Sequence, residues 1–199
     1  FLAGELSLAR LPFLREHVVA GDKVLPASCY VDMIAQACAK IHGKSARIDH
    51  LRIMRPCVLD DRPLGLYCRV GPGAVDIFTR LARDDAWCHH VRATVSHDAV
   101  PAARRHSLEA DRAACPQIIA PKRLRDQARR AGIDYGPAFH AIDTLWRGTG
   151  VALARITWPS ALARGWTGAG LHPVLLDACF QAIGAAVGDS DQPADPALL

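Results

Sequence analysis

Two stretches of the chain show the same succession of hydrophobic and polar positions. In the first, apolar residues recur every three or four positions in ASCYVDMIAQACAKIHG (27–43), which predicts a helix that Ser28 caps and Gly43 ends. Alternation before it predicts a short strand in GELSLAR, and PFLREHVVAGDKVLP is predicted to be a loop. Four strand candidates follow: ARIDHLRIMRP, PLGLYCRVG, AVDIFTRLA and AWCHHVRATVSH. This order is typical of a curved antiparallel sheet wrapped around one helix.

The second stretch repeats the pattern after a segment without a clear period. Residues 98–119 are rich in Ala, Arg and Pro and are predicted to be a linker. PKRLRDQARRAG then predicts a short helix, and AFHAIDTLWRG and VALARITWP predict paired strands. HPVLLDACFQAIGAAVG predicts a second helix that is apolar on nearly every side and therefore buried. We expect an α+β protein with two similar units, residues 1–97 and residues 120–199.

The second unit lacks the strands that follow the first helix. Only DSDQPADPALL remains after Gly188, although so apolar a helix needs a sheet to cover it. We therefore expect this unit to be incomplete at its C-terminus and the parent polypeptide to continue past Leu199 with further strands.

Composition narrows the class of protein. With 199 residues, half of them apolar, the chain can bury a sizeable core. No apolar run reaches the roughly 20 residues that span a bilayer, and FLAGELSLARL lacks the order of a secretion signal, so we expect no membrane segment and a cytoplasmic location. The 7 cysteines are odd in number and never spaced as CxxC, which argues against a disulfide framework and a structural zinc site.

The charge of the chain is a weak indication of its binding partner. The net charge of +4 favours an anionic partner. Much of it lies in PKRLRDQARRAG, which includes Arg123, Arg125, Arg129 and Arg130. A solvated helix face accounts for most of these arginines. Nucleic-acid binding is poorly supported, because aromatic residues are only 6% of the chain and no known nucleic-acid-binding motif is present.

One histidine before the first predicted helix is followed by a glycine and a proline that could shape a binding loop. In HVVAGDKVLP, His17 is followed by Gly21, which allows backbone to approach a ligand closely, and by Pro26, which stiffens the entry to the helix. An imidazole titrates near neutral pH and can act as a base there. Taken alone, however, a loop histidine is more often a surface residue.

Two later segments could carry chemistry. GIDYGPAFH predicts a tight turn containing Tyr135, Gly136 and Pro137, which by itself is a turn with an aromatic anchor. In LHPVLLDACFQA, Asp177 lies in an apolar helix with Gln181 one turn later and able to hydrogen-bond to it. Burial would raise the pKa of such a carboxyl and make it a candidate general acid. A buried aspartate satisfied locally is the alternative.

Together the three segments resemble the dehydratase domains of modular polyketide synthases. The HxxxGxxxxP motif of that family is matched by His17, Gly21 and Pro26. GIDYGPAF matches GYxYGPxF except for Ile133 in place of the first tyrosine, and LHPVLLDACFQ matches LHPxxLDxxxQ. The three motifs occur in the family's order, and the resemblance extends over nearly the whole chain. Two departures, Leu11 in place of a histidine and HA after Phe139 in place of QG, bear on substrate fit.

The resemblance implies a double hot-dog fold, with two long helices each wrapped by an antiparallel sheet. It implies that His17 comes from the first unit and Asp177 from the second, facing each other across a tunnel that admits an acyl chain on a phosphopantetheine arm. His17 would be the base and Asp177 the acid in removing water from a β-hydroxyacyl thioester. No metal or diffusible cofactor is expected.

The resemblance also assigns supporting roles. Gln181 and Tyr135 would orient the aspartate and the hydroxyl, the Gly21 N–H would bind the thioester carbonyl, and Pro26 would hold the histidine loop. The expected partners are an acyl carrier protein, met by some of the arginines named above, and the neighbouring synthase domains. A homodimer is compatible with the family, although no residue here indicates one.

Four alternatives stay open. Relatives on this scaffold shift double bonds, cyclise chains by attack of a hydroxyl on the new enoyl group, or close aromatic rings. Retention of Asp177 favours dehydration over the first two, in which asparagine is common, but leaves a bifunctional dehydratase and cyclase open. The fourth alternative is a non-catalytic domain that serves as a spacer or as a docking surface for the carrier protein.

Overall fold

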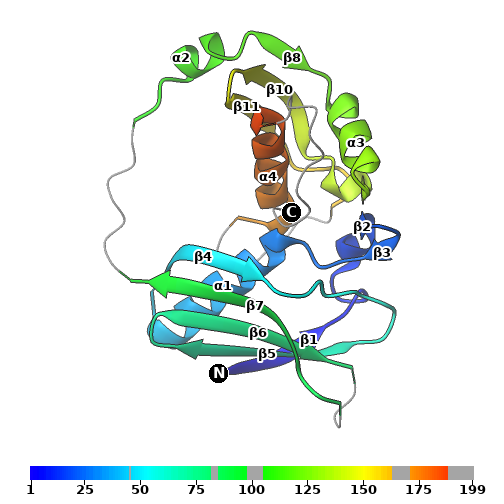
Figure 1. The fold of residues 1–199 in the computed structure, drawn as a ribbon, viewed down its shortest axis with the longest axis vertical. Coiled ribbons are helices and arrows are strands. Elements are labelled where there is room, and N and C mark those ends of the chain that lie inside the picture. Colours follow the sequence, from blue (N-terminus) through cyan, green and yellow to red (C-terminus); the bar gives the residue numbers. More distant parts are fainter. Residues whose placement is uncertain (45, 82–84, 98–104, 163–170, 188–199) are drawn as a thin grey trace. The chain divides into compact units, whose positions relative to one another are not determined.

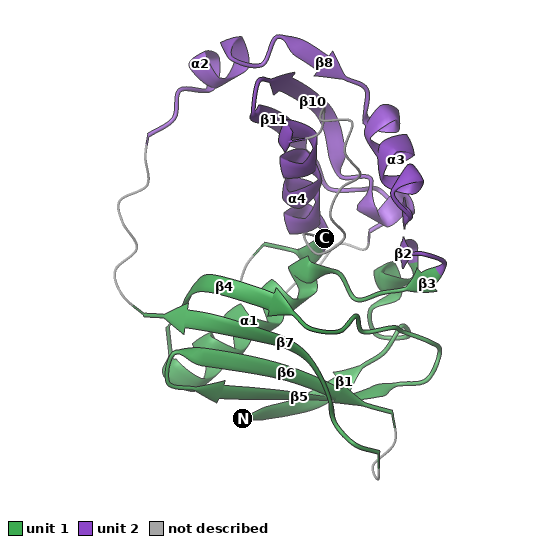
Figure 2. Cartoon of the chain, viewed as in Figure 1, with its two compact units in different colours: residues 1–15, 22–101, 165–173 green, residues 16–21, 102–164, 174–199 purple. Residues whose placement is uncertain are grey.

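The computed structural model describes residues 1–44, 46–81, 85–97, 105–162 and 171–187. The chain divides into two compact units (Figure 2). Unit 1 consists of residues 1–15, 22–101 and 165–173, and unit 2 of residues 16–21, 102–164 and 174–199. The division differs from the predicted one at residues 16–21, which carry His17 and belong to the second unit, and at residues 165–173, which belong to the first.

Unit 1 contains a five-stranded antiparallel sheet and one long helix (Figure 1). The strand order is β1-β5-β6-β7-β4. The elements are β1 (Leu2–Leu6), η1 (Pro12–Glu16, a 3-10 helix that ends in unit 2), β3 (Asp22–Lys23), α1 (Ala27–His42), β4 (Arg47–Ile53), β5 (Leu64–Gly71), β6 (Ala74–Arg80) and β7 (Cys88–Ser96). The helix and the four strands predicted after it are confirmed.

The buried residues of unit 1 alternate along its strands and recur at helical spacing along α1. Alternate residues of β6 and β7, among them Ile77 and Val91, are fully buried, as is Ile34 of α1. The helix ends as predicted, since Gly43 adopts φ 68° and its N–H donates to the Ala39 carbonyl. The predicted cap is wrong. The helix begins directly after Pro26, so Ser28 lies inside its first turn, where its hydroxyl is buried without a hydrogen-bond partner among the described residues.

Unit 2 is built around a three-stranded antiparallel sheet of order β11-β10-β8 and a second long helix (Figure 1). Its elements are β2 (His17–Val19), α2 (Leu108–Ala113), β8 (Gln117–Ile119), α3 (Pro121–Arg130), β9 (Ile133–Tyr135), η2 (Pro137–Phe139), β10 (Ile142–Gly148), β11 (Val151–Ile156) and α4 (Pro173–Val187). Ile119, Leu145 and Ala178 are among its buried residues. The predicted helices and paired strands are confirmed.

The segment predicted as a linker contains structure. Within 98–119, α2 begins after Ser107, whose hydroxyl accepts a hydrogen bond from the Ala110 N–H. β8 then pairs with β10, placing Ile119 opposite Leu145. A strand of three residues is too short to show a period, so only tertiary pairing reveals it. Residues 98–104 lie outside the described residues.

The second helix is less buried than predicted. Its face toward Asp177 and Ala178 is buried, but Phe180, Ile183 and Val187 are exposed, the last by 73%. These residues are spaced three and four apart and form an apolar stripe. The covering strands and the continuation past Leu199 stay predictions, since the structure describes no residue beyond 187.

Each unit thus combines a long helix with an antiparallel sheet, and the chain has the double hot-dog fold expected from its sequence. All 7 cysteines are free and 5 of them are buried. None of the helices in the described part of the chain has the length and hydropathy needed to cross a membrane.

Candidate active site

His17 lies in a strand of unit 2, where the sequence predicted a loop. β2 pairs antiparallel with β9 and places His17 opposite Tyr135. Both strands have three residues, and their partners are more than a hundred positions apart, so no local pattern could indicate the pairing. This pairing is also the reason that residues 16–21 belong to unit 2. The expectation that the histidine comes from the first unit is corrected accordingly.

The His17 ring is enclosed by two aromatic rings. Its centroid is 5.5 Å from that of Tyr135 and 5.4 Å from that of Phe139. The side chain is buried, with 8% of its surface exposed. The aromatic anchor predicted in GIDYGPAFH therefore packs against the candidate base, which a turn that served structure alone would not require.

Asp177 lies in the first turns of α4 and is 5% exposed. Gln181 Nε2 donates to Asp177 Oδ2 over 2.9 Å, the hydrogen bond that the i,i+4 spacing predicted. Burial raises the pKa of Asp177, and the nearby charge of His17 and the Gln181 hydrogen bond only partly oppose this effect. The carboxyl is therefore biased toward its protonated form, as a general acid requires.

Tyr135 completes the group. Burial raises the pKa of its phenol, and the negative charge of Asp177 raises it further, so the hydroxyl stays protonated. The charge of His17 acts on Asp177, the charge of Asp177 acts on Tyr135, and the rings of His17 and Tyr135 are in contact, so the three side chains belong to one site within unit 2.

The other predicted site residues have defined structural places. Gly21 follows Ala20 in the β2–β3 turn with φ 91°, in the left-handed region that favours glycine. Pro26 is fully buried and precedes the first residue of α1. Pro137 opens η2, and Gly136 precedes it. These positions fit the supporting roles, which stay predictions.

The α3 arginines fall into two groups. Arg129 forms ion pairs with Asp126 and Asp134. In the part of the chain that the structure describes, Arg123, Arg125 and Arg130 form no ion pair, and Arg123 and Arg130 are exposed. Among the described residues these three guanidinium groups thus have no carboxylate partner, whereas that of Arg129 has two.

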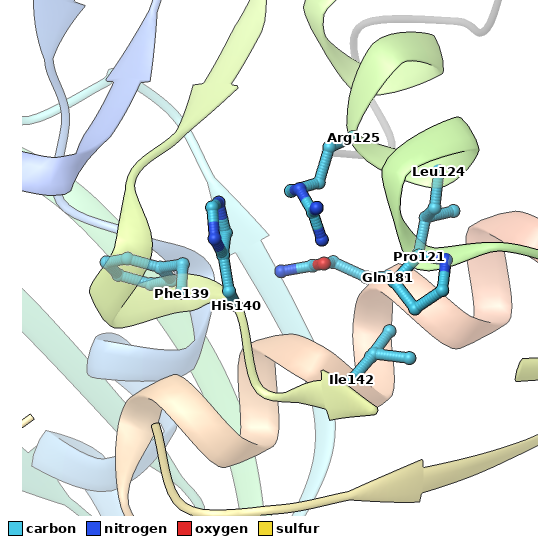
Figure 3. A pocket seen from close by; sticks show the side chains of 7 residues that line it. All are labelled: Pro121, Leu124, Arg125, Phe139, His140, Ile142 and Gln181. Carbon is cyan, nitrogen blue, oxygen red and sulfur yellow. The ribbon is translucent and has the colours of Figure 1, made fainter. Parts of the chain in front are cut away.

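One of them, Arg125, lines a small pocket with His140 and Gln181 (Figure 3). The cavity has a volume of about 10 Å³, room for about one water molecule. The His140 Nε2 lies 2.9 Å from the Tyr135 carbonyl oxygen, to which it donates. A glutamine amide can donate in the same way, so the departure from the family's QG keeps a donor at this position.

Sequence reasoning missed one residue. Glu16 directly precedes His17, and its side chain and backbone both bind the turn that follows Tyr135. Its only sequence signal was its position next to the candidate base. Among the described residues no group of three or more His, Cys, Asp or Glu side chains could hold a metal ion.

A buried, protonation-biased carboxyl beside an enclosed imidazole, carried on a double hot-dog fold, defines a candidate acid–base site. Residues 103–199 match the family described as "Polyketide synthase dehydratase N-terminal domain", and residues 1–80 match that described as "Polyketide synthase dehydratase domain". The chain belongs to the dehydratase domains of polyketide synthases.

The similar curated proteins are large synthases. Phthioceranic/hydroxyphthioceranic acid synthase of Mycobacterium tuberculosis (strain ATCC 25618 / H37Rv) is 29% identical over 192 residues, which cover 91% of this chain and 9% of that protein. Polyketide synthase ThaG of Burkholderia thailandensis is 28% identical, with 94% of this chain and 4% of that protein covered. The chain therefore spans less than a tenth of the length of these relatives.

Solved structures of dehydratase domains share the fold. The domain from the CurK module of curacin polyketide synthase has a TM-score of 0.81 and 27% identity, with 94% of this chain and 69% of that chain covered. The domain of a mycocerosic acid synthase-like synthase has a TM-score of 0.76 and 28% identity, with 92% and 66% covered. The domain from the CurF module reaches 0.83 at 23% identity, over 95% and 71%.

Proposed function

We propose that this domain removes water from a β-hydroxyacyl thioester carried on an acyl carrier protein, giving an α,β-unsaturated acyl chain during polyketide synthesis. The observation that carries the proposal is the buried Asp177, whose pKa is raised and which lies within electrostatic range of the buried His17. Membership of the dehydratase family gives the reaction class. The residue roles are the proposed part.

Elimination of water requires two proton transfers. The α-proton is weakly acidic and hydroxide is a poor leaving group, so a base is needed at one carbon and an acid at the next. His17 takes the α-proton, and Asp177, neutral before reaction, protonates the departing β-hydroxyl. A raised carboxyl pKa and an imidazole within one site are the combination that this chemistry uses.

Other groups act on charge and orientation. Gln181 holds Asp177 through the hydrogen bond to Oδ2, which leaves the other carboxyl oxygen for the substrate. The Tyr135 hydroxyl, kept protonated by burial, can donate to the β-hydroxyl. The Gly21 N–H stabilises the charge that builds on the thioester carbonyl. None of these steps requires a metal or a diffusible cofactor.

Two solved relatives support the assignment of acid and base. One CurK dehydratase with an Asp-to-Asn substitution and another with a His-to-Phe substitution are each described as an inactive mutant. The same two residue types form the proposed pair here. A cyclising or isomerising activity is the second candidate; retention of an aspartate at position 177 favours dehydration.

The test is mass spectrometry of a carrier protein loaded with each β-hydroxyacyl epimer and incubated with the complete protein. Loss of one water from one epimer is the expected result. From a substrate with a second, suitably placed hydroxyl, the cyclised product has also lost one water and has the same mass as the unsaturated chain. A ring ether in place of the double bond, identified by NMR of the released product, would therefore favour the cyclase. No change with either epimer in folded protein would favour the docking role.

We expect the exposed arginine side chains of α3 to contact the acyl carrier protein. Carrier proteins are acidic, so Arg123→Glu with Arg130→Glu should slow processing of the carrier-bound substrate by roughly 10-fold at low salt. A small thioester mimic of the substrate should be processed at the wild-type rate. Arg10→Glu with Arg52→Glu, two exposed positions in unit 1, changes the net charge by the same amount and serves as the control. Steady-state rates on both substrates measure this, and equal slowing on both would rule out a docking role.

A further inference from the structure

The turn that carries Tyr135 and Phe139 is attached to the residue before His17. The Gly136 N–H donates to the Glu16 carbonyl oxygen over 2.8 Å. The Ala138 N–H donates to Glu16 Oε2 over 2.5 Å, across 122 positions of sequence. Within the turn, the Phe139 N–H donates to the Gly136 carbonyl. One residue therefore binds the turn through both its main chain and its side chain.

The Glu16 side chain lies so close to residue 136 that only glycine fits there. A Cβ on Gly136 would lie 2.7 to 2.9 Å from three side-chain atoms of Glu16, closer than real contacts allow. The backbone angles of Gly136, φ −80° and ψ 177°, are ordinary for any residue. The glycine in this motif is therefore explained by the Glu16 side chain lying against it, and not by a strained turn.

The bonded turn presents its rings to the candidate base. Tyr135 precedes Gly136 and Phe139 follows Ala138, so the two N–H groups that Glu16 fixes lie between the two rings that contact His17. A carboxylate that accepts a main-chain N–H forms a stronger hydrogen bond than a neutral acceptor. Loss of this bond would free the turn to move relative to β2.

We propose that Glu16 is a positioning residue for the dehydration, holding the turn of residues 136–139 so that Tyr135 and Phe139 keep the His17 imidazole in its reactive orientation. The inference rests on the proposed function and adds a residue to it. Glu16 does not touch the substrate in this scheme. It acts through the orientation of His17, so its removal should affect the chemical step more than binding.

The test compares three variants in the complete protein. Glu16→Ala removes the acceptor, Glu16→Gln keeps an acceptor oxygen of the same shape, and Asp134→Asn removes an exposed carboxylate from the same pair of strands without touching the turn. We expect Glu16→Ala to lower kcat by roughly 100-fold with KM little changed, as small misplacements of catalytic groups do. Glu16→Gln should retain kcat within about 3-fold because its amide oxygen can accept the same N–H, and Asp134→Asn should match wild type.

A second readout does not depend on activity. Diethyl pyrocarbonate modifies accessible histidines, and peptide mass spectrometry reports the rate at His17. That rate should rise in Glu16→Ala and stay at the wild-type level in Glu16→Gln. If the alanine variant does not fold, Glu16→Asp replaces it, because it keeps the charge and withdraws the carboxylate from the Ala138 N–H.

The outcomes separate the two proposals. Inactive wild-type protein would overturn the proposed function, and the histidine modification rates alone would then decide the role of Glu16. Active wild type with an unchanged kcat in Glu16→Ala would overturn the positioning role. An equal loss in Glu16→Ala and Glu16→Gln would do the same, since the retained acceptor should restore the turn.

Discussion

His17→Phe and Asp177→Asn should each lower kcat/KM for a carrier-bound β-hydroxyacyl substrate by about 1000-fold or more, because each removes one of two proton transfers that a general base or acid typically accelerates by roughly 100- to 10,000-fold. Phenylalanine keeps an aromatic ring beside Tyr135 and Phe139 but has no nitrogen to accept a proton. Asparagine can still accept the Gln181 hydrogen bond but has no acidic proton to transfer. Both variants preserve the shape of the site.

The measurement is the initial rate of water loss from the loaded carrier, followed by mass spectrometry. Phe180→Leu, on the exposed side of α4, is a matched control that changes the same helix away from the site. Activity within about 10-fold of wild type in either variant would contradict the assigned role, given the size that such catalysis usually has. The double variant should be no slower than the slower single one, since acid and base act in one elimination.

The helix and most strands of the first unit could be predicted from the sequence, because each of them shows its period within one continuous stretch of residues. Strands of seven to nine residues alternate long enough to show a period of two, and α1 repeats at helical spacing until Gly43 stops it. The Asp177–Gln181 hydrogen bond could be predicted for the same reason. Its two residues lie one helical turn apart, so the sequence spacing alone placed them on one face.

The surroundings of His17 could not be predicted in this way. The pairing of β2 with β9 joins two three-residue strands from opposite halves of the chain, and its hydrogen bonds are main-chain bonds that carry no side-chain signature. For the same reason Glu16 was missed, since its bond to Ala138 depends on tertiary structure. The family motifs identified His17 and Tyr135 as partners in function. They contained nothing that placed the histidine strand in the second unit.

The similarity of the two units extends to a second buried carboxyl, that of Asp32, to which we assign no catalytic role. On α1, Gln36 Nε2 donates to Asp32 Oδ2 over 2.6 Å, the same i,i+4 arrangement as Gln181 and Asp177 on α4. Asp32 is also buried, and burial raises its pKa, opposed by the Gln36 hydrogen bond. Two helices thus carry the same costly pair. Of the two carboxyls, only Asp177 has a histidine, His17, among the charges that act on its pKa.

Asp32→Asn and Asp177→Asn should therefore each stabilise the protein at pH 8, by on the order of 1 kcal/mol, or about 2 to 4 °C in the midpoint of thermal unfolding. A carboxyl whose pKa is higher in the folded than in the unfolded chain favours folding most when protonated. Its contribution is fully present below the unfolded-state pKa of about 4 and is lost as pH rises through the folded-state pKa. Asparagine, which does not ionise, keeps that contribution at every pH.

Melting curves between pH 4 and pH 8 test this prediction, with Asp126→Asn as the control of opposite sign, because the Lys122 hydrogen bond lowers the pKa of Asp126. The gain from Asp32→Asn and Asp177→Asn should appear at pH 8 and vanish toward pH 4, and a gain independent of pH would contradict an origin in burial of charge. Only Asp177→Asn should also abolish water loss. Equal stabilisation with unequal loss of activity would mean that burial imposes the same cost on both carboxyls, and that the neighbouring imidazole, rather than burial itself, turns one of them into a catalytic acid.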